Sequence, residues 1–330
     1  MDQIALEAFN DQLKQQIFDD LGLSGKKVTL LDGFESFVFA SDDKIVRVTH
    51  HSHRLPPQIA AELEFIKYLA DKGAAVCLPN TLPNGELLST IDSFTACIFD
   101  RAKGEAPGRG DWVPSVIKEW GRCIGGFHQL SQSFKPANKR IDWRQDENHN
   151  FAGRIPASQG KIIALANQLL ADLEALPVND DIYGLIHGDA HAGNFFVDDG
   201  KLTFFDFDDA IYMWFAYDIA TVLFSAVLGQ HVEASRSAQE AEALRFLPHF
   251  LEGYSEVLPV DPFVLREMDR FLKLRELSLY AVIHAYLDVN SLTDWYAGRF
   301  MKNREQRIVN GEPHLDMDFK IGRASCRERV

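Results

Sequence analysis

The chain has 330 residues, enough for about two ordinary domains of roughly 150 residues each. Its apolar fraction is 46% and its charged fraction is 25%, which indicates a globular protein rather than a disordered one. Because 48 acidic residues outnumber 34 basic residues, the formal net charge is -14. This charge argues against nucleic acid as a partner, since a basic face is needed to hold it.

Neither a membrane span nor a secretion signal is expected. The longest apolar stretch, residues 219–228, is about half as long as a helix that crosses a bilayer. Residues 1–12 lack the basic and apolar blocks of a signal peptide. The four cysteines are scattered without a CxxC pair, which argues against a disulfide framework and against a zinc knuckle. We therefore expect a cytoplasmic protein with no membrane partner.

The N-terminal part of the chain predicts a leading helix followed by an antiparallel β-meander. Apolar residues recur at helical spacing in the helices and crowd together in the strands, and Gly33 and the Asp42-Asp43 turn separate the first strands. The expected elements are a helix at 4–21, strands at 28–32, 36–40 and 44–49, a helix at 58–73 and a strand at 94–99. The loose segment 100–104 then marks the expected domain boundary.

The rest of the chain is expected to be mainly helical. One stretch, residues 183–210, instead has the pattern strand, loop, strand, turn, strand. Asp261-Pro262 is expected to open a long helix, and Ser291 with Asp294 resembles a capping box for the last helix. The expected helices lie at 113–130 and 162–176 and as a series over 214–308.

The C-terminal residues 321–330, IGRASCRERV, need separate treatment. They resemble read-through translation of a common sequencing adapter fused to a gene fragment. We expect this tail to be non-native and the true C-terminus to be missing, so the tail plays no part in the fold argument.

The sequence that carries chemistry is HGDAHAGN at 187–194, followed by Asp206. Phosphoryl transfer needs a carboxylate that orients the acceptor hydroxyl and takes its proton, oxygen ligands for magnesium, and donors for the phosphates. Asp189 and Asn194 lie five positions apart on one loop and can serve as base and metal ligand. Asp206 follows on a returning strand that can bring a second carboxylate into the same site.

These two motifs, HGDxHxxN and DFDDA, resemble the catalytic and metal loops of the aminoglycoside phosphotransferase and choline kinase superfamily, which has a protein-kinase-like fold. The resemblance covers roughly residues 25–310 and is strongest to bacterial phosphotransferases with a DFDD metal loop. It implies Asp189 as the catalytic base, Asn194 and Asp206 as Mg2+ ligands, and His187 as structural support for the loop.

The resemblance also implies a fold class. This is an α+β, two-lobe fold with a small, mainly antiparallel β N-terminal lobe and a larger helical C-terminal lobe. Residues 1–99 would form the nucleotide-binding lobe with its leading helix, residues 100–320 the helical lobe with the catalytic and metal loops, and residues 321–330 the adapter-derived tail.

Several residues of the motifs allow a second interpretation. The HxDxH pattern could belong to a zinc hydrolase, although no further ligand cluster stands in an obvious partner position. His191 could support the loop or approach the phosphate. Asp208 could be a solvated turn carboxylate, as could Asp209, and Asp218 is expected to cap the helix that follows it.

In the N-terminal lobe, the resemblance predicts a cation on the third strand, fixed by a helix glutamate. The residue at that place is Arg47 instead of the usual lysine, and Glu62 fits its helix partner. The phosphate-covering turn would be residues 33–38, with Gly33 and Ser36 near the nucleotide. Residues 97–101 would form the hinge at adenine, including Cys97 and Phe99. The histidines that follow the third strand, in the run THHSHR, are expected to be incidental to a polar loop rather than metal ligands.

We therefore predict an ATP-dependent kinase that uses Mg2+ to move the γ-phosphoryl group of ATP to a hydroxyl group of a small molecule, such as an amino sugar or an amine. Two alternatives stay open at this point. One is a serine/threonine protein kinase. The other is a nucleotide-binding pseudokinase that acts as an interaction protein, for which Arg47 is the warning sign.

Overall fold

The computed structural model describes residues 3–31, 33, 35–231, 234–292 and 295–319. The adapter-like tail and Asp294 of the expected capping box lie outside these residues. The chain divides into two compact units, each made of three segments. The first unit comprises Met1–Glu105, Ser133–Arg140 and Phe195–Asp208, and the second comprises Ala106–Gln132, Ile141–Asn194 and Asp209–Val330. The segment with Asp206 thus groups with the N-terminal part, and the division into residues 1–99 and 100–320 stays a prediction.

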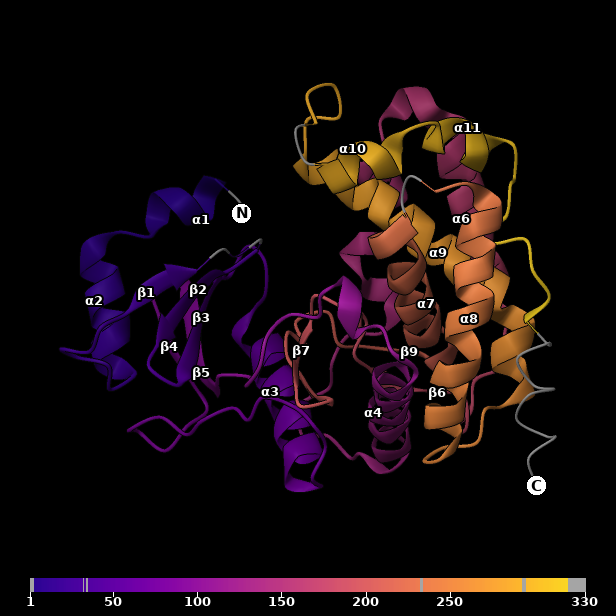
Figure 1. The fold of residues 1–330 in the computed structure, drawn as a ribbon. Coiled ribbons are helices and arrows are strands. Elements are labelled where there is room, and N and C mark those ends of the chain that lie inside the picture. The colour runs from indigo at the N-terminus through magenta and orange to yellow at the C-terminus, as the bar shows by residue number, and fades with distance from the viewer. Residues whose placement is uncertain (1–2, 32, 34, 232–233, 293–294, 320–330) are drawn as a thin grey trace. The chain divides into compact units, whose positions relative to one another are not determined.

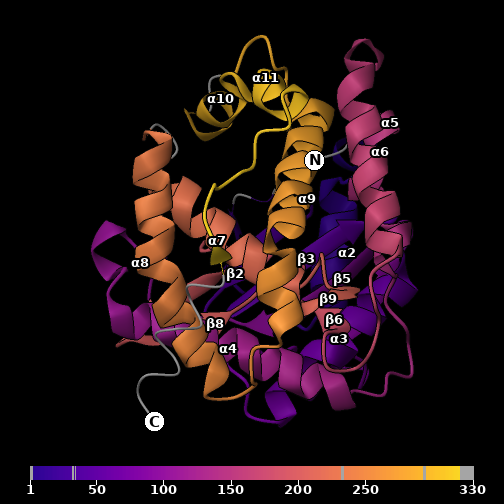
Figure 2. The ribbon, with the colours of Figure 1, turned by 90° about the vertical axis from the view of Figure 1, so that its right-hand side faces the viewer.

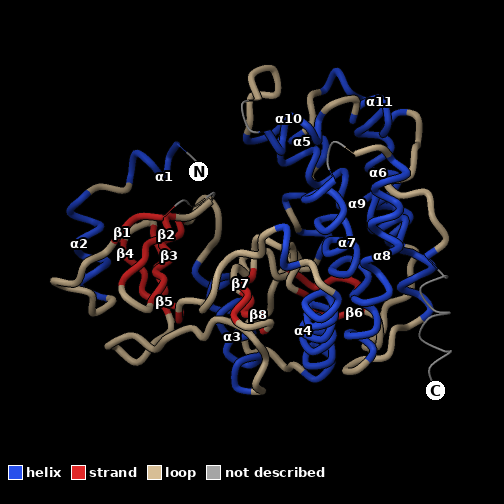
Figure 3. Tube along the Cα trace, in the orientation of Figure 1, coloured by secondary structure: helices blue, strands red, loops and turns tan. Residues whose placement is uncertain are grey.

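A five-stranded antiparallel sheet forms the centre of the first unit (Figures 1 and 3). Its strands run in the order β1-β2-β3-β5-β4. They are β1 (Thr29–Leu31), β2 (Phe37–Ser41), β3 (Lys44–His50), β4 (Leu88–Ile91) and β5 (Phe94–Asp100). Tight turns join neighbouring strands at Asp42 and Asp92, both with left-handed backbone conformation. The antiparallel meander that the sequence predicts is therefore present.

The alternation of side chains along the strands decides which face meets which helix. On one face, Val46, Val48 and Ile98 pack with α2 (Asp11–Asp20) in a buried apolar cluster. On the other face, Cys97 packs with residues of α3 (Pro56–Asp71). Arg47 lies between Val46 and Val48 in β3, so its side chain points to the α3 face.

The leading helix expected over residues 4–21 is two helices in the structure, α1 (Gln3–Ala8) and α2. The break has a local cause: the side chain of Asn10 accepts a hydrogen bond from the Leu13 N–H at 3.0 Å and thereby caps a new helix. Helix α3 begins at Pro56, a residue that suits a first helical position.

The first unit also contains the hairpin of β7 (Phe195–Asp198) and β8 (Lys201–Phe204). Phe204 joins this hairpin to the segment that follows α3. Its N–H donates to the Ala75 carbonyl at 2.8 Å, and its own carbonyl accepts from the Cys77 N–H at 2.8 Å. These bonds fix the end of β8, from which the predicted metal loop leaves.

The second unit is mainly helical, as the sequence predicts (Figure 3). The α-helices of the second unit are α4 (Pro114–Ser133), α5 (Phe151–Arg154), α6 (Gly160–Glu174), α7 (Phe215–His231), α8 (Arg236–Ser255), α9 (Pro262–Tyr286), α10 (Trp295–Met301) and α11 (Arg304–Val309). Helix α7 is almost wholly apolar and contacts α8 and α9 (Figure 2). Short 3-10 turns lie at Arg109–Asp111, Trp143–Gln145, Glu147–His149 and Ala157–Gln159.

Two further features of the second unit bear on the site. Asp261 caps α9 by accepting from the Phe263 N–H at 2.7 Å, which agrees with the start predicted at Asp261-Pro262. A short strand that the sequence analysis missed, β9 (Ile211–Trp214), pairs with β6 (Tyr183–Ile186). Among the described residues, none of the helices combines the length and the apolar character that crossing a membrane requires.

Candidate active site

The loop between β6 and β7 carries HGDAHAGN, and a buried aspartate anchors its start. Asp218 lies in the first turn of α7 and accepts hydrogen bonds from the His187 N–H at 3.0 Å and from the Gly188 N–H at 2.9 Å. His128 Nε2 lies 3.1 Å from the same carboxylate. Asp218 therefore fixes the backbone of the loop, whereas the sequence analysis expected it to cap its own helix.

The second residue of the motif has to be glycine. Gly188 has φ +84°, and a Cβ atom at this position would lie 2.1 Å from the Asp209 carbonyl oxygen. His187 is completely buried, and its Nδ1 lies 3.4 Å from the Asp189 backbone nitrogen. The two residues before Asp189 thus fix the backbone conformation of the loop, and this conformation sets the position of Asp189.

Both carboxylate oxygens of Asp189 have partners. Oδ1 accepts from Arg275 Nη2 of α9 at 2.6 Å, while Oδ2 lies 3.2 Å from His191 Nε2 and 3.3 Å from Asn194 Nδ2. Burial alone would raise the pKa of Asp189, but the charges of His191 and Arg275 outweigh it and hold this pKa well below its usual value. Asp189 is therefore an ionised acceptor near neutral pH.

His191 and Asn194 turn back onto the same aspartate. The Gly193 N–H donates to His191 Nδ1 at 2.8 Å, so the proton of a neutral imidazole lies on Nε2, which faces Asp189. Asn194 Nδ2 also donates to the Asp189 carbonyl at 2.9 Å. Because the amide nitrogen makes these bonds, Oδ1 of Asn194 is the atom left for a metal ion, and such oxygen ligands suit Mg2+.

In the first unit, Arg47 and Glu62 form a buried bidentate ion pair. Nη1 of Arg47 donates to Oε1 at 2.8 Å and Nη2 donates to Oε2 at 2.7 Å. The guanidinium carbon lies 5.5 Å from the centre of the Phe99 ring. Burial alone would lower the pKa of Arg47, yet the Glu62 charge raises it well above its usual value. The structure therefore brings together the strand cation and the helix glutamate that the sequence paired.

Asp208 contradicts the interpretation of a solvated turn carboxylate, because it is buried among cationic groups. His53 Nε2 lies 2.6 Å from its Oδ2, Arg54 Nε lies 3.4 Å from the same oxygen, and Arg47 Nη1 lies 3.8 Å from Oδ1. Although burial raises the pKa of Asp208, the His53 hydrogen bond and the two arginine charges hold it well below its usual value. His53 therefore contacts Asp208, and the expectation that it is incidental to a polar loop is wrong.

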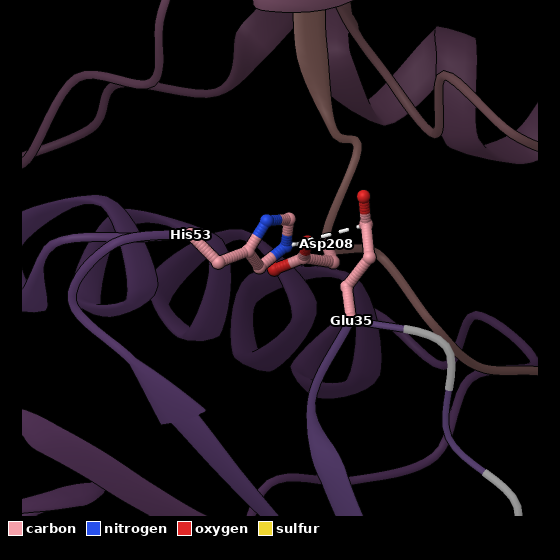
Figure 4. Close-up of side chains that lie close together, drawn as sticks. All are labelled: Glu35, His53 and Asp208. Atoms are coloured by element: carbon pink, nitrogen blue, oxygen red, sulfur yellow. Dashed lines mark hydrogen bonds and ion pairs between the residues drawn. The ribbon is translucent and has the colours of Figure 1, made fainter. Parts of the chain in front are cut away.

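Glu35, His53 and Asp208 present three donor atoms within 4.8 Å of one another, the usual spacing of a metal site (Figure 4). The two arginines decide against a metal ion here. Arg54 shares Oδ2 of Asp208 with His53, and Arg47 faces Oδ1, so the carboxylate already has cationic neighbours. A divalent cation would be repelled by both guanidinium groups.

The predicted phosphate-covering turn is closely packed. A Cβ atom on Gly33 would lie 2.2 Å from the Ser36 carbonyl oxygen, which explains the glycine. The hydroxyl of Ser36 is buried and lies 2.8 Å from Thr49 Oγ1 of β3. The Ser36 side chain therefore ties the turn to the sheet, and any contact of this turn with phosphate would come from its backbone.

The predicted hinge over 97–101 lies within β5 as far as Asp100. Cys97 pairs with Arg47 of β3 on one side and with Leu88 of β4 on the other, and its side chain is buried. Burial raises the pKa of its thiol to about 12, so it is an unreactive core residue. The side chain of Cys97 packs against Ile59 and Leu63 of α3, and a contact of this segment with adenine stays a prediction.

Asp206 follows β8 and has a left-handed backbone conformation, with φ 62°. Such a conformation is uncommon outside glycine and is found at functional sites. Asp206 belongs to the first unit, while Asp189 and Asn194 belong to the second. The boundary between the units falls directly after Asn194, and the pairing of Asn194 with Asp206 as metal ligands stays a prediction.

Three residues of the site were missed or given another role in the sequence analysis: Arg275 was missed, Asp208 was interpreted as a solvated turn carboxylate, and Asp218 was interpreted as a helix cap. Two of them left a signal. Asp218 stands in an otherwise apolar helix, and Arg275 follows the buried residues Phe271 and Leu272 at helical spacing, so each is a charged residue on a buried face. A buried charged side chain needs a partner of opposite charge or a hydrogen bond. A search for such partners would therefore have identified both residues as candidates for the site.

A family model described as the phosphotransferase enzyme family matches residues 28–260. The chain belongs to this family. It is 32% identical over 310 residues to amicoumacin kinase of Bacillus subtilis, covering 90% of this chain and 91% of the relative.

The chain also resembles solved kinase structures. Amicoumacin kinase hAmiN, in complex with AMP-PNP, Ca2+ and Ami, superposes with a TM-score of 0.88 and 26% identity, covering 97% of this chain and 99% of that one. A microcompartment-associated aminopropanol kinase has the same fold, with a TM-score of 0.69 and 19% identity over 92% of this chain and 98% of that one.

These likenesses confirm the predicted protein-kinase-like fold class. They also confirm that this phosphotransferase is an ATP-dependent enzyme acting on small molecules. They give no support to the protein kinase alternative or to the pseudokinase alternative.

Proposed function

We propose that this phosphotransferase moves the γ-phosphoryl group of Mg·ATP to a hydroxyl group of amicoumacin or of a chemically similar small molecule, with Asp189 as the catalytic base. The observation that carries the proposal is the Asp189 carboxylate, which is ionised, fixed by its neighbours and positioned on a loop that Asp218 anchors.

Each neighbour of Asp189 has a role in this proposal. Arg275 holds Oδ1, so the carboxylate cannot rotate freely and Oδ2 is the oxygen that meets the acceptor hydroxyl. His191 faces Oδ2 and yields its place there to the hydroxyl. Once oriented, the hydroxyl passes its proton to Oδ2 as its oxygen bonds to the γ-phosphorus. The bond from that phosphorus to the β,γ-bridging oxygen breaks, and ADP leaves.

In the same proposal, Arg47 holds the α- and β-phosphates, and Glu62 keeps its guanidinium in place. Asn194 and Asp206 hold Mg2+, because an amide oxygen and a carboxylate are ligands that this ion prefers. When bound, the ion neutralises charge on the phosphates. The turn with Gly33 and Ser36 covers the phosphates, and the segment of Cys97 and Phe99 lies near the adenine.

Two relatives support an acceptor with the size of a small metabolite or antibiotic. Amicoumacin kinase shares about a third of its residues with this chain over nearly the whole length of both. The aminopropanol kinase supports the fold, and its name indicates that the fold can serve a small amino alcohol. We also propose a cytoplasmic location, because Cys77, Cys97 and Cys123 are free thiols.

The proposal is tested by measuring ADP release with Mg·ATP and a panel of acceptors: amicoumacin, 1-amino-2-propanol, spectinomycin and choline. We expect release that depends on amicoumacin and saturates with it, and only background release with choline. Acceptor-independent ADP release of equal rate throughout the panel would contradict a small-molecule kinase, and saturable release with another member would correct the acceptor.

A further inference from the structure

The side chain of Asp208 is contacted from two other segments of the first unit. Arg47 comes from β3, and His53 and Arg54 come from the connection between β3 and α3. A fourth residue, Arg140, donates a hydrogen bond to the Asp208 backbone carbonyl. Both the side chain and the main chain of Asp208 are therefore held, and its position in the unit is fixed.

Asp206 lies between this fixed point and a second one. On its N-terminal side, Phe204 bonds through its N–H and its carbonyl to residues 75 and 77. On its C-terminal side, Phe207 is buried with its ring 6.2 Å from that of Phe65 in α3, and Asp208 follows. The backbone on both sides of Asp206 is thus held by contacts of its neighbours, and these contacts constrain where the Asp206 carboxylate lies.

His53 makes the shortest of the side-chain contacts to Asp208, and the same imidazole nitrogen reaches a second carboxylate. Nε2 lies 2.6 Å from Oδ2 of Asp208 and 3.4 Å from Oε2 of Glu35, which belongs to the turn between β1 and β2 (Figure 4). Figure 4 shows His53 extending from its loop toward the two acidic side chains. His53 therefore joins the phosphate-covering turn to the segment that carries Asp206.

We propose that His53 is a positioning residue for Mg·ATP: through Asp208 it sets the place of the Asp206 carboxylate, and through Glu35 it ties the phosphate-covering turn to that place. The inference rests on the proposed function, in which Asp206 holds the metal ion. His53 itself touches neither metal nor nucleotide in this scheme, and its effect passes through Asp208.

The test is calorimetric and needs no turnover. The affinity for AMP-PNP is measured with Mg2+ and with EDTA, and the ratio of the two affinities gives the tightening due to the metal. In His53→Ala we expect this ratio to fall about tenfold, the scale of a lost hydrogen bond to a charged group, while the affinity in EDTA changes by less than about twofold. A general loss of structure would lower both affinities equally.

Two variants sharpen the result. His53→Gln keeps a side-chain N–H near the position of Nε2 and should recover at least half of the lost tightening on a logarithmic scale. His51→Ala is the matched control, since His51 belongs to the same loop but bonds to Thr95 at 3.1 Å, and it should keep the wild-type ratio. Rescue by glutamine distinguishes positioning from simple filling of space.

The contact between His53 and Glu35 is tested by a double-mutant cycle. Glu35→Gln should weaken AMP-PNP by about two- to threefold in Mg2+, because the 3.4 Å contact is the weaker one. Added to His53→Ala, it should cost nothing further, since both act through one imidazole. Additive losses would remove Glu35 from the scheme.

The outcomes separate the inference from the proposed function. Wild-type protein that binds AMP-PNP more tightly in Mg2+, with an unchanged ratio in a folded His53→Ala, overturns the inference alone. An equal loss in Mg2+ and EDTA does the same, because it assigns His53 to the fold. If wild-type protein shows no tightening by Mg2+, the metal assignment fails and the inference fails with it.

Discussion

Asp189 in the second unit and Asp208 in the first are both carboxylates with a histidine and an arginine as neighbours, although Asp208 is buried and Asp189 is partly exposed. They differ in where those neighbours come from. The histidine of Asp189 lies two residues away in the same loop, whereas the histidine of Asp208 lies 155 residues away in the sequence. Asp189 is held by Arg275 of α9, whereas Asp208 faces both Arg47 and Arg54.

The difference fits two separate tasks. A carboxylate that accepts a proton from a substrate has to exchange one of its partners for the substrate, and a nearby loop histidine can be displaced at little cost. A carboxylate that holds several segments together gains from partners that come from distant parts of the chain, because each contact then fixes a separate segment. Asp189 is thus suited to accept a proton from a substrate, and Asp208 is suited to hold separate segments in place.

The largest expected effect is on turnover, from Asp189→Asn. Asparagine keeps the size of the side chain but cannot take the hydroxyl proton, so kcat should fall about a hundredfold or more. Affinity for AMP-PNP should stay within about twofold, because the base is not a phosphate ligand. Steady-state kinetics and calorimetry on the same preparations measure both quantities.

Asp199→Asn serves as the matched control for that variant. Asp199 is an exposed carboxylate in the turn between β7 and β8, and its left-handed backbone conformation, φ 49°, suits asparagine as well. Its kcat should equal that of wild type. If Asp189→Asn retained activity within about threefold, the base would have to be sought elsewhere.

The next effect concerns the cation of β3. Arg47→Ala should weaken ATP and ADP by about ten- to a hundredfold and leave adenosine unchanged, since a guanidinium bond to phosphate is charge-assisted. Glu62→Gln should weaken both nucleotides less, because it only loosens the bidentate pair. Fluorescence or calorimetric titration with the three ligands measures the pattern, and unchanged nucleotide affinity in Arg47→Ala would make Arg47 an ordinary buried strand residue.

A smaller effect is expected at the arginine of α9. Arg275→Met removes the partner of Asp189 Oδ1 and keeps the apolar length of the side chain, so kcat should fall about tenfold through lost orientation. Arg275→Lys should lie between methionine and wild type, because it keeps the charge but not the planar fork. Equal falls in kcat for lysine and methionine would mean that geometry, and not charge, governs this contact.

The smallest effect is a pH dependence of stability at Asp208. Its pKa is lowered in the folded state, so its ionised form stabilises the fold above the unfolded value of about 3.9, and this contribution fades as pH falls below that value. Asp208→Asn should therefore be less stable than wild type at pH 7, and the gap should narrow as the pH is lowered from about 5 to 3. Urea unfolding across this range measures the gap, and a constant gap would contradict the ionised cluster.

Sequence reasoning found the residues that lie close together in one motif. The loop of Asp189 and Asn194 could be interpreted because its spacing carries the chemistry. Arg47 and Glu62 could be paired because the family resemblance implies a cation on the third strand and a glutamate on the next helix. Asp208 was interpreted wrongly as a solvated turn carboxylate because its partners come from segments far apart in the sequence, and no local pattern indicates such contacts. Helices α1 and α2 were predicted as one helix for another reason. The apolar residues recur at helical spacing through both, and this pattern hides the cap at Asn10.

The most direct test of the account is the product of one incubation with Mg·ATP and amicoumacin, analysed by mass spectrometry and by nucleotide chromatography. The account predicts amicoumacin carrying one additional phosphoryl group, formed in equal amount with ADP by wild-type protein and absent with Asp189→Asn. ADP formed without a phosphorylated acceptor, or a phosphorylated acceptor formed equally well by Asp189→Asn, would contradict it.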